Sequence, residues 1–244
     1  MLERIEVLGV PVDRVNMKQS LAWVEHRVAG DKPEPIFSLN SEVVVMAQSN
    51  PVLLNLFRDG GLLIPDGIGV IVAAKLLGLG RIEQVPGCEL MPAICERAAE
   101  KGYSIFLFGA ASDVNKKTQE VLQARFPGIR IAGARDGYVK DAEMPQLIDE
   151  INASGAQILF VALGCPRQEL WVERYLPQLD VKVCQVVGGT FDVIAGTVKR
   201  APLVFRKMYL EWFYRLASQP KRIMRQTALI KFASQVVRER LGLF

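Results

Sequence analysis

Short apolar runs alternate with segments of helical period along most of the chain, and this alternation restricts the fold more than any other feature. The runs are predicted as strands and lie at 5–10, 35–40, 61–65, 104–109, 128–133, 157–164 and 182–189. The segments between them are predicted as helices over 18–28, 41–48, 69–77, 89–101, 112–126, 142–153 and 166–176. Strands that alternate with helices form a mostly parallel sheet with helices on both faces, so we predict an α/β fold.

The charge of the chain is distributed unevenly. Residues 199–244 contain eleven Lys or Arg and two Glu, a net charge of +9, and because the whole chain carries +4, residues 1–198 carry −5. The strand pattern also stops near Ala201, and 244 residues suit one large domain with an appendage. We therefore predict a catalytic domain over 1–198 and a helical appendage over 199–244.

The appendage is predicted as two amphipathic helices separated near Gln219–Pro220, because proline ends a helix before it. Each helix sets charged side chains against a broad apolar arc: Lys207, Glu211 and Arg215 in the first, Arg222, Arg225 and Arg238 in the second. Basic amphipathic helices suit an anionic membrane surface. An apolar tail away from a membrane also favours self-association into a homo-oligomer.

Several residue types and motifs are missing from the sequence. His26 is the only histidine and lies on a predicted helix, which argues against Ser-His-Asp and Cys-His hydrolases. The four cysteines lack C-x-x-C spacing, so neither a zinc site nor a disulfide framework is indicated. There is no G-x-x-x-x-G-K-[ST] motif and no D-x-D pair, so we expect a metal-independent site rather than a P-loop.

With Glu3 and Glu6 at the start and no uncharged apolar run of spanning length, we expect a cytoplasmic protein, free or peripheral on a membrane face.

Polar residues and glycines follow the carboxyl ends of the predicted strands. They are Asn40, Asp66, the turn at Gly109, "GCPRQE" at 164–169 and "GGTFD" at 188–192. Open α/β sheets bind ligands at these ends, so one crevice is expected to collect all five.

Each of these features also has a purely structural interpretation. Pro-Asp-Gly is a favoured turn, Ser38 and Asn40 are suited to cap a helix, and the glycine pair 188–189 is suited to a bulge. Polar groups after Pro166 also solvate a helix end, and "GIG" at 67–69 is only a fragment of a dinucleotide motif. The sequence leaves both interpretations open for each feature.

Taken together, "SLNSE", "PDGIG", "VPGCEL", "FLFGA", "VALGCPRQELW", "VGGTFDVIAG", "KRAP" and "EWFYRL…QPKR" resemble the WecG/TagA/CpsF family of bacterial glycosyltransferases in order and spacing. The resemblance implies a Rossmann-like fold, an inverting reaction without a metal, and a C-terminal appendage that brings arginines over the active site. It implies transfer of a sugar from a UDP-sugar to a polyprenyl-diphosphate-linked acceptor on the inner face of the cell membrane. The best-described member type adds N-acetylmannosamine to undecaprenyl-diphosphate N-acetylglucosamine, in teichoic acid or polysaccharide synthesis.

By this resemblance Asp66 is the general base that takes a proton from the acceptor hydroxyl, a role open to a positioned carboxylate. Asn40 and Gln168 match residues that hold the sugars, and the catalytic candidate Ser38 stands where close relatives have threonine, which keeps the hydroxyl. The set Arg215, Arg222 and Arg225 matches the appendage arginines that neutralise diphosphate charge. We further predict that the nucleotide sugar contacts Gly109, Ala110, Tyr138, Gly164, Gly189 and Asp192.

The chain departs from the family pattern at three places. Ser41 stands in place of the usual alanine. In the family's Gly-x-Asp-Leu pattern, here Gly87-Cys88-Glu89-Leu90, glutamate replaces the aspartate, and Gln84 stands where relatives often have an arginine. We hypothesise that Arg81 supplies the phosphate contact missing at Gln84.

Two other functions remain open: a nucleotide-binding regulator or scaffold whose tail binds a partner or nucleic acid, and a dinucleotide-dependent dehydrogenase. For the transferase we expect no nucleic-acid partner.

Overall fold

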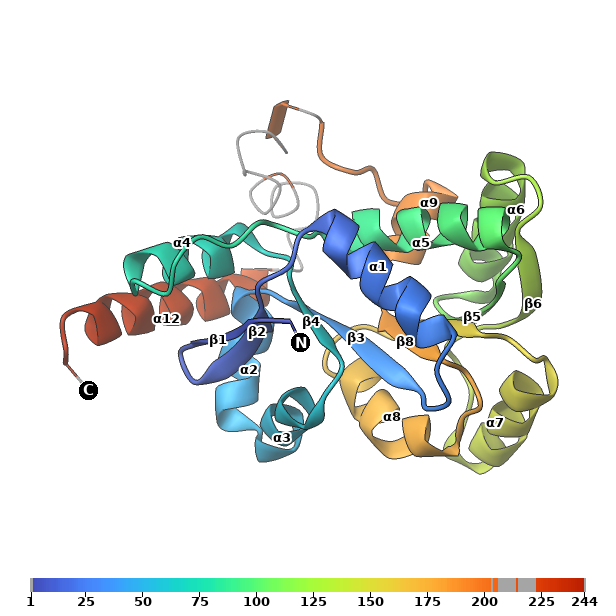
Figure 1. The fold of residues 1–244 in the computed structure, drawn as a ribbon, viewed down its shortest axis with the longest axis horizontal. Helices are drawn as coiled ribbons and strands as arrows, with labels where there is room; N and C mark the ends of the chain where they lie inside the picture. Colours follow the sequence, from blue (N-terminus) through green and yellow to red (C-terminus); the bar gives the residue numbers. More distant parts are fainter. Residues whose placement is uncertain (1, 203, 206–213, 215–222, 244) are drawn as a thin grey trace.

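The computed structural model of the chain describes residues 2–202, 204–205, 214 and 223–243. Its centre is a six-stranded sheet in which every neighbouring pair of strands is parallel (Figure 1). In spatial order the strands are β4 (Leu62–Pro65), β3 (Glu34–Leu39), β8 (Val183–Val186), β7 (Ile158–Ala162), β5 (Ser104–Gly109) and β6 (Arg130–Arg135). The predicted α/β class and the parallel sheet are therefore confirmed.

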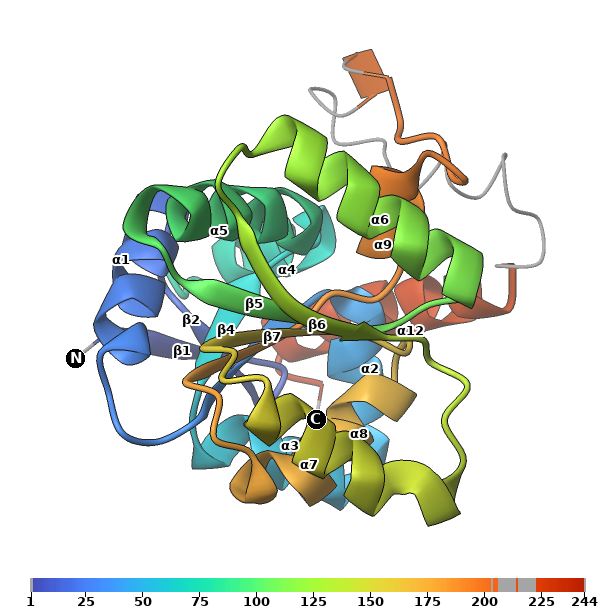
Figure 2. The same ribbon diagram turned by 90° about the vertical axis from the view of Figure 1, so that its right-hand side faces the viewer.

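Helices cover both faces of the sheet (Figure 2). One face carries α1 (Met17–Val28), α5 (Gly87–Lys101), α6 (Ser112–Arg125) and α9 (Thr190–Ala195). The other carries α2 (Ser41–Ser49), α3 (Pro51–Asp59), α7 (Met144–Ala153) and α8 (Arg167–Tyr175), while α4 (Ile68–Leu76) extends beyond the edge of the sheet (Figure 1). Short 3-10 turns at Asp141–Glu143 and Leu176–Gln178 flank α7 and α8.

Side chains of the strands alternate between two apolar cores, as a sheet buried on both faces requires. Ile36 and Phe160 belong to the core under α1 and α5, whereas Phe37 and Phe108 belong to the core under α2 and α8. The alternation fixes the register, because a shift of one residue would exchange the two cores. In β3 it also directs Ser38 to the α5 side, two residues after Ile36.

The first predicted strand, 5–10, is wrong. It is a β-hairpin of β1 (Arg4–Val7) and β2 (Val10–Asp13), which forms a separate antiparallel sheet. The turn residues Leu8 and Gly9 both have positive φ, at 54° and 76°, as a tight hairpin turn requires. A leucine rarely adopts this conformation, so the turn had no clear sequence signal.

Two helices, α3 and α9, were not predicted. Asn50 caps α3, its side chain accepting hydrogen bonds from the Val52 and Leu53 amides, and Pro51 occupies the first turn. An Asn-Pro start is a recognised helix signal, so this helix was predictable.

The second appendage helix is confirmed as α12 (Ile223–Arg240), which packs beside α2 and α4 (Figure 1). Its Phe232 and Val236 are buried in the core on the α2 side. Most of the first appendage helix lies outside the described residues, and so do Arg215 and Arg222. The backbone of Arg225 lies in the first turn of α12.

Candidate active site

A large open cavity lies at the carboxyl ends of β3, β4, β7 and β8, with a volume of about 2050 Å³. β3 and β8 are neighbours in the sheet although they lie far apart in the chain, and open α/β sheets bind ligands at the carboxyl ends of their strands. A typical small-molecule site measures about 300–1,000 Å³, so this cavity is large enough for two substrates. Predicted site residues on its lining are Ser38, Asn40, Asp66, Gly164, Gln168, Gly189 and Asp192.

Asp66 and Ser38 lie together where β3 and β4 meet the first turn of α5. The Asp66 amide donates to the Leu39 carbonyl at 3.0 Å, which ties the end of β4 to the end of β3. Both side chains point at Gly87: a methyl group placed on that residue would clash with Ser38 Oγ and lie 3.4 Å from Asp66 Oδ2. Because Gly87 has no side chain, the Ser38 hydroxyl and the Asp66 carboxylate can both lie against the first turn of α5.

Gln84 stabilises the loop that carries Asp66. Its side-chain amide donates to the Asp66 carbonyl, and the Val85 amide donates to the Pro65 carbonyl at 2.8 Å. Gln84 therefore holds the backbone of Asp66 in place. Arg81, three residues earlier, lies on the cavity lining and is exposed, with no hydrogen bond or ion pair to another described residue.

Asn40 has the capping role considered from the sequence, and its sugar-binding role remains a prediction. It is the N-cap of α2, its Oδ1 accepting from the Glu42 and Val43 amides at 3.0 and 3.1 Å, and it also lines the cavity. Its Oδ1 is occupied by the helix, so the side-chain NH2 is the group it retains for a ligand.

Gln168 is 6% exposed, so the interpretation of its segment as a solvated helix end is wrong for this residue. Its Oε1 accepts from the Gly164 amide at 3.2 Å and the Gly188 amide at 3.0 Å, which joins the turns after β7 and β8. Its Nε2 donates to Glu169 Oε1 at 2.9 Å. One amide hydrogen remains for a sugar, as the resemblance implies, but most of the bonding capacity of Gln168 is internal.

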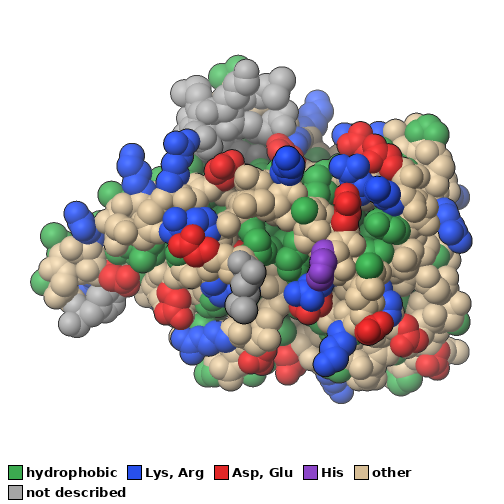
Figure 3. Space-filling view, viewed as in Figure 1, with side chains coloured by type: hydrophobic (Ala, Val, Ile, Leu, Met, Phe, Trp, Pro, Cys, Tyr) green, Lys and Arg blue, Asp and Glu red, His purple; other side chains and the backbone are tan. Residues whose placement is uncertain are grey.

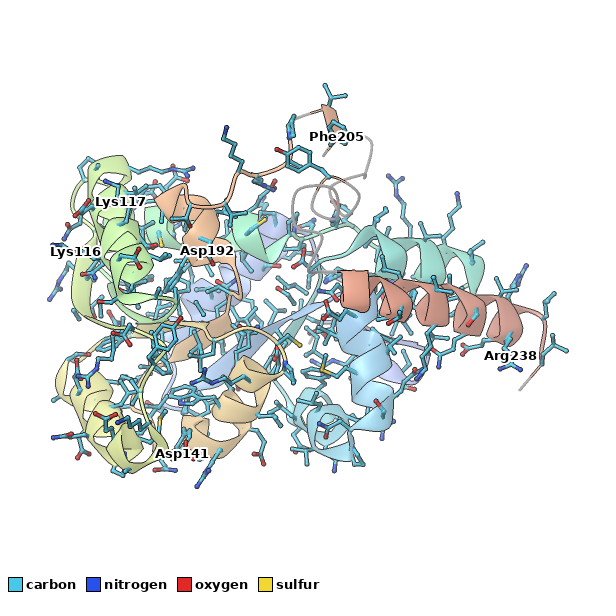
Figure 4. All side chains as sticks on the ribbon, turned by 180° about the vertical axis from the view of Figure 1, so that it is seen from behind. Lys116, Lys117, Asp141, Asp192, Phe205 and Arg238 are labelled. Atoms are coloured by element: carbon cyan, nitrogen blue, oxygen red, sulfur yellow. The ribbon has the colours of Figure 1, made fainter. Side chains whose placement is uncertain are left out.

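Three of the six residues predicted to bind the nucleotide lie apart from the cavity lining: Gly109, Ala110 and Tyr138. Gly109 and Ala110 have φ of 119° and 58°, and the Ala110 amide donates to the Ala162 carbonyl at 2.9 Å, so this turn packs tightly against β7. Tyr138 is 76% exposed. Gly164, Gly189 and Asp192 line the cavity, with Asp192 on α9 (Figure 4). The nucleotide role of all six remains a prediction.

Two features of the cavity are suited to attract an anion, although acidic side chains such as Glu42, Glu83 and Asp192 also line it. The N-terminal end of α5 faces it, and a helix of 15 residues carries a partial positive charge at that end. Lys75, Arg81 and Arg200 also line it, although Arg200 pairs with Glu89 Oε1 at 2.5 Å. An N-terminal helix end with nearby cations is suited to bind phosphate.

The described residues contain no group of three His, Cys, Asp or Glu side chains arranged to hold a metal ion. None of the four cysteines forms a disulfide in the part of the chain that the structure describes. Burial raises the pKa of the Cys95 and Cys184 thiols, which keeps them in the neutral form. Within the part of the chain that the structure describes, no helix is both long and apolar enough to cross a membrane.

Comparison with known proteins agrees with the resemblance seen in the sequence motifs. Residues 5–243 match the sequence model described as "Glycosyl transferase WecG/TagA/CpsF family". A protein of Bacillus spizizenii is 37% identical over 203 residues, which cover 83% of this chain and 78% of that protein. A protein of Staphylococcus aureus is 32% identical over 237 residues, or 96% and 92% of the two chains. Both are named N-acetylglucosaminyldiphosphoundecaprenol N-acetyl-beta-D-mannosaminyltransferase. The chain belongs to the WecG/TagA/CpsF family of glycosyltransferases.

Proposed function

We propose that this protein transfers N-acetylmannosamine from UDP-N-acetylmannosamine to undecaprenyl-diphosphate-linked N-acetylglucosamine, with inversion at the anomeric carbon. The names of two relatives that align over most of the chain support the two sugars and the lipid. The observation that carries the proposal is the position of Asp66, beside Ser38 and at the N-terminal end of α5, in a cavity with room for both substrates.

In the proposed reaction, the acceptor hydroxyl loses its proton to Asp66 while its oxygen attacks the anomeric carbon. The bond from that carbon to the β-phosphate oxygen breaks, and UDP leaves with the bonding electrons. General-base catalysis of this kind contributes typically about 10²–10⁴-fold. Ser38 Oγ, on the same side of Gly87, is placed to orient the reacting hydroxyl.

The leaving diphosphate gains negative charge as the bond breaks, and this charge needs stabilisation. We assign that task to the N-terminal end of α5 and to Arg81, with no metal ion. Arginine suits it because the guanidinium forms paired hydrogen bonds to phosphate oxygens. Arg215, Arg222 and Arg225 are proposed to add to this charge when the acceptor is bound.

The acceptor is a lipid, and α12 has a surface suited to the membrane that holds it. Helical spacing places Ile230, Val237 and Leu241 on one stripe, and they are 73%, 53% and 65% exposed, whereas Phe232 and Val236 face α2 and α4. The exposed Lys231 and Arg238 flank the stripe on one side and Arg240 on the other. An apolar stripe between basic residues is typical of an interfacial helix.

This stripe is continuous with the cavity mouth. Ile230 of α12 and Val72 and Lys75 of α4 line the cavity, and Val72 and Leu76 are each 46% exposed. Lys and Arg side chains surround apolar ones over this end of the molecule (Figure 3), and Arg238 lies at the far end of α12 (Figure 4). We propose that the protein binds the inner face of the cell membrane peripherally through this stripe, with the cavity open to the lipid diphosphate.

Turnover tests the catalytic proposal. Purified protein mixed with UDP-N-acetylmannosamine and a short-chain diphosphate-linked N-acetylglucosamine acceptor should release UDP, and EDTA should leave the rate unchanged. Omitting the acceptor is the control, because hydrolysis alone also releases UDP. UDP binding without acceptor-dependent release would instead support a nucleotide-binding regulator.

Vesicle flotation tests the membrane proposal. Ile230→Glu/Val237→Glu should abolish binding to anionic vesicles, and Val52→Glu/Leu170→Glu is the matched control, because both are exposed apolar residues on other helices, α3 and α8. Equal loss in both double variants would mean that charge alone, and not the apolar stripe, drives binding. Binding that survives in Ile230→Glu/Val237→Glu would contradict the proposed surface.

A further inference from the structure

Glu169 is buried at the cavity, and the sequence analysis gave it no role. It is 3% exposed, lies in the first turn of α8 and lines the same cavity as Asp66. Its Oε1 accepts from Gln168 Nε2, but its Oε2 is buried and has no hydrogen-bond partner among the described residues. A buried carboxylate oxygen without a partner is costly, so its presence needs an explanation.

The orientation of the Gln168 amide identifies what Glu169 does. Two backbone N–H groups, those of Gly164 and Gly188, point at one end of this amide, and an N–H group donates only to an acceptor. The oxygen must therefore occupy that end, and the NH2 group must face Glu169. Glu169 Oε1 thus acts as an acceptor, and it holds the amide in the orientation that joins the two glycine turns.

The surroundings of Glu169 favour the uncharged acid. Within the described residues no Lys or Arg forms an ion pair with it. The groups that face it are the carboxylate of Glu42 on α2 and the thiol of Cys165 before α8. Burial is the largest effect and raises the pKa of Glu169; hydrogen bonds from the Gln168 amide, the backbone and the Cys165 thiol lower it, and the charge of Glu42 raises it by the smallest amount.

We propose that Glu169 is a positioning residue that works as an uncharged carboxylic acid: its Oε1 fixes the Gln168 amide, which holds together the turns after β7 and β8. In this form Oε2 carries the proton, so Glu169 both accepts from Gln168 and has one hydrogen to donate toward Cys165 or a sugar oxygen. Ionisation would place a buried charge without an ion pair beside Glu42 and would remove the hydrogen from Oε2. The effect on turnover rests on the proposed function, whereas the effect on stability does not.

Glu169→Gln tests the proposal, because glutamine is the neutral isostere of the protonated acid. The pKa of Glu169 is raised in the folded state, so its stabilising effect is complete below the unfolded value of about 4.3 and is lost as pH rises toward the folded value. Over that range the folding equilibrium constant of the wild type should fall up to tenfold per pH unit relative to Glu169→Gln. Glu173→Gln, an exposed glutamate one turn later on α8, is the matched control and should track the wild type.

Turnover supplies the second measurement. The wild type should lose kcat at high pH as Glu169 ionises, and Glu169→Gln should lack this decline, whereas Glu169→Ala should lower kcat at every pH. Glu169→Gln that fails to fold, or that loses more than about tenfold in kcat at every pH, would show that the ionised form is required. An unfolding difference that does not change with pH would also overturn the proposal. If the wild type shows no turnover, the proposed function fails, but the unfolding measurement still decides the charge of Glu169.

Discussion

Gly87→Ala is the substitution whose effect follows most directly from the geometry of the site. The added methyl group would clash with Ser38 Oγ and lie 3.4 Å from Asp66 Oδ2. Overpacking of this kind costs about 1–3 kcal/mol, and alanine in a helix recovers up to ~1 kcal/mol relative to glycine. We therefore expect a net loss of about 1–2 kcal/mol, which for a chain of 244 residues lowers the melting temperature by about 2–8 °C.

The effect of Gly87→Ala on activity should be larger than its effect on stability. The Ser38 hydroxyl must move away from Asp66 to admit the methyl group, and a displacement of about 1 Å in a catalytic group can cost ~10²-fold. We expect kcat/KM to fall by about 10²-fold in an assay of UDP release, while circular dichroism shows a folded protein.

Gly30→Ala is the matched control for Gly87→Ala. Gly30 follows α1 and precedes the amino end of β3, the end opposite the site, and an added methyl group would lie 3.2 Å from the Arg27 carbonyl oxygen. It should change stability modestly and leave kcat/KM unaltered. A Gly87→Ala protein with wild-type kcat/KM would refute the argument that Ser38 and Asp66 work together around this glycine.

Further predictions concern charge, capping and the core. Arg81→Ala should raise KM for the UDP-sugar and lower kcat by about tenfold or more in steady-state kinetics, because a phosphate contact is lost. An unchanged rate would show that Arg81 does not bind the phosphate. Asn40→Ala should cost about 1 kcal/mol in urea unfolding through the lost α2 cap and also reduce turnover, and a purely structural Asn40 would give the first effect alone. Phe160→Ala, in the core under α5, should cost about 3–5 kcal/mol in the same unfolding measurement, and a loss below 1 kcal/mol would contradict its burial.

The sequence predicted the sheet well because its strands are short apolar runs bounded by glycine and polar residues. Ser104–Gly109, for example, matches the predicted run residue for residue. The hairpin at Leu8–Gly9 was missed because the positive φ of a leucine has no sequence signal. Helix α9 was missed because six residues are too few to establish a helical period.

Within the site, the sequence identified most of the residues that line the cavity but not what they bond to, and the expectation that the turn at Gly109 joins the same cavity is wrong. Asn40 and Asp66 lie at the ends of neighbouring strands, so their proximity follows from the parallel sheet. The hydrogen bond from the Gly188 amide to Gln168 Oε1 joins residues 20 positions apart, and it depends on the orientation of the glutamine side chain. The role of Gln84 as a donor to the Asp66 carbonyl is likewise visible only in three dimensions.

The measurement that tests the central claim most directly is acceptor-dependent UDP release by Asp66→Asn beside the wild type. The amide keeps the size of the side chain but cannot take a proton, so the fold should persist while kcat falls by about 10²–10⁴-fold. Wild-type protein should release UDP from UDP-N-acetylmannosamine only when the lipid-diphosphate acceptor is present. Equal rates for the two proteins would contradict the assignment of Asp66 as the general base.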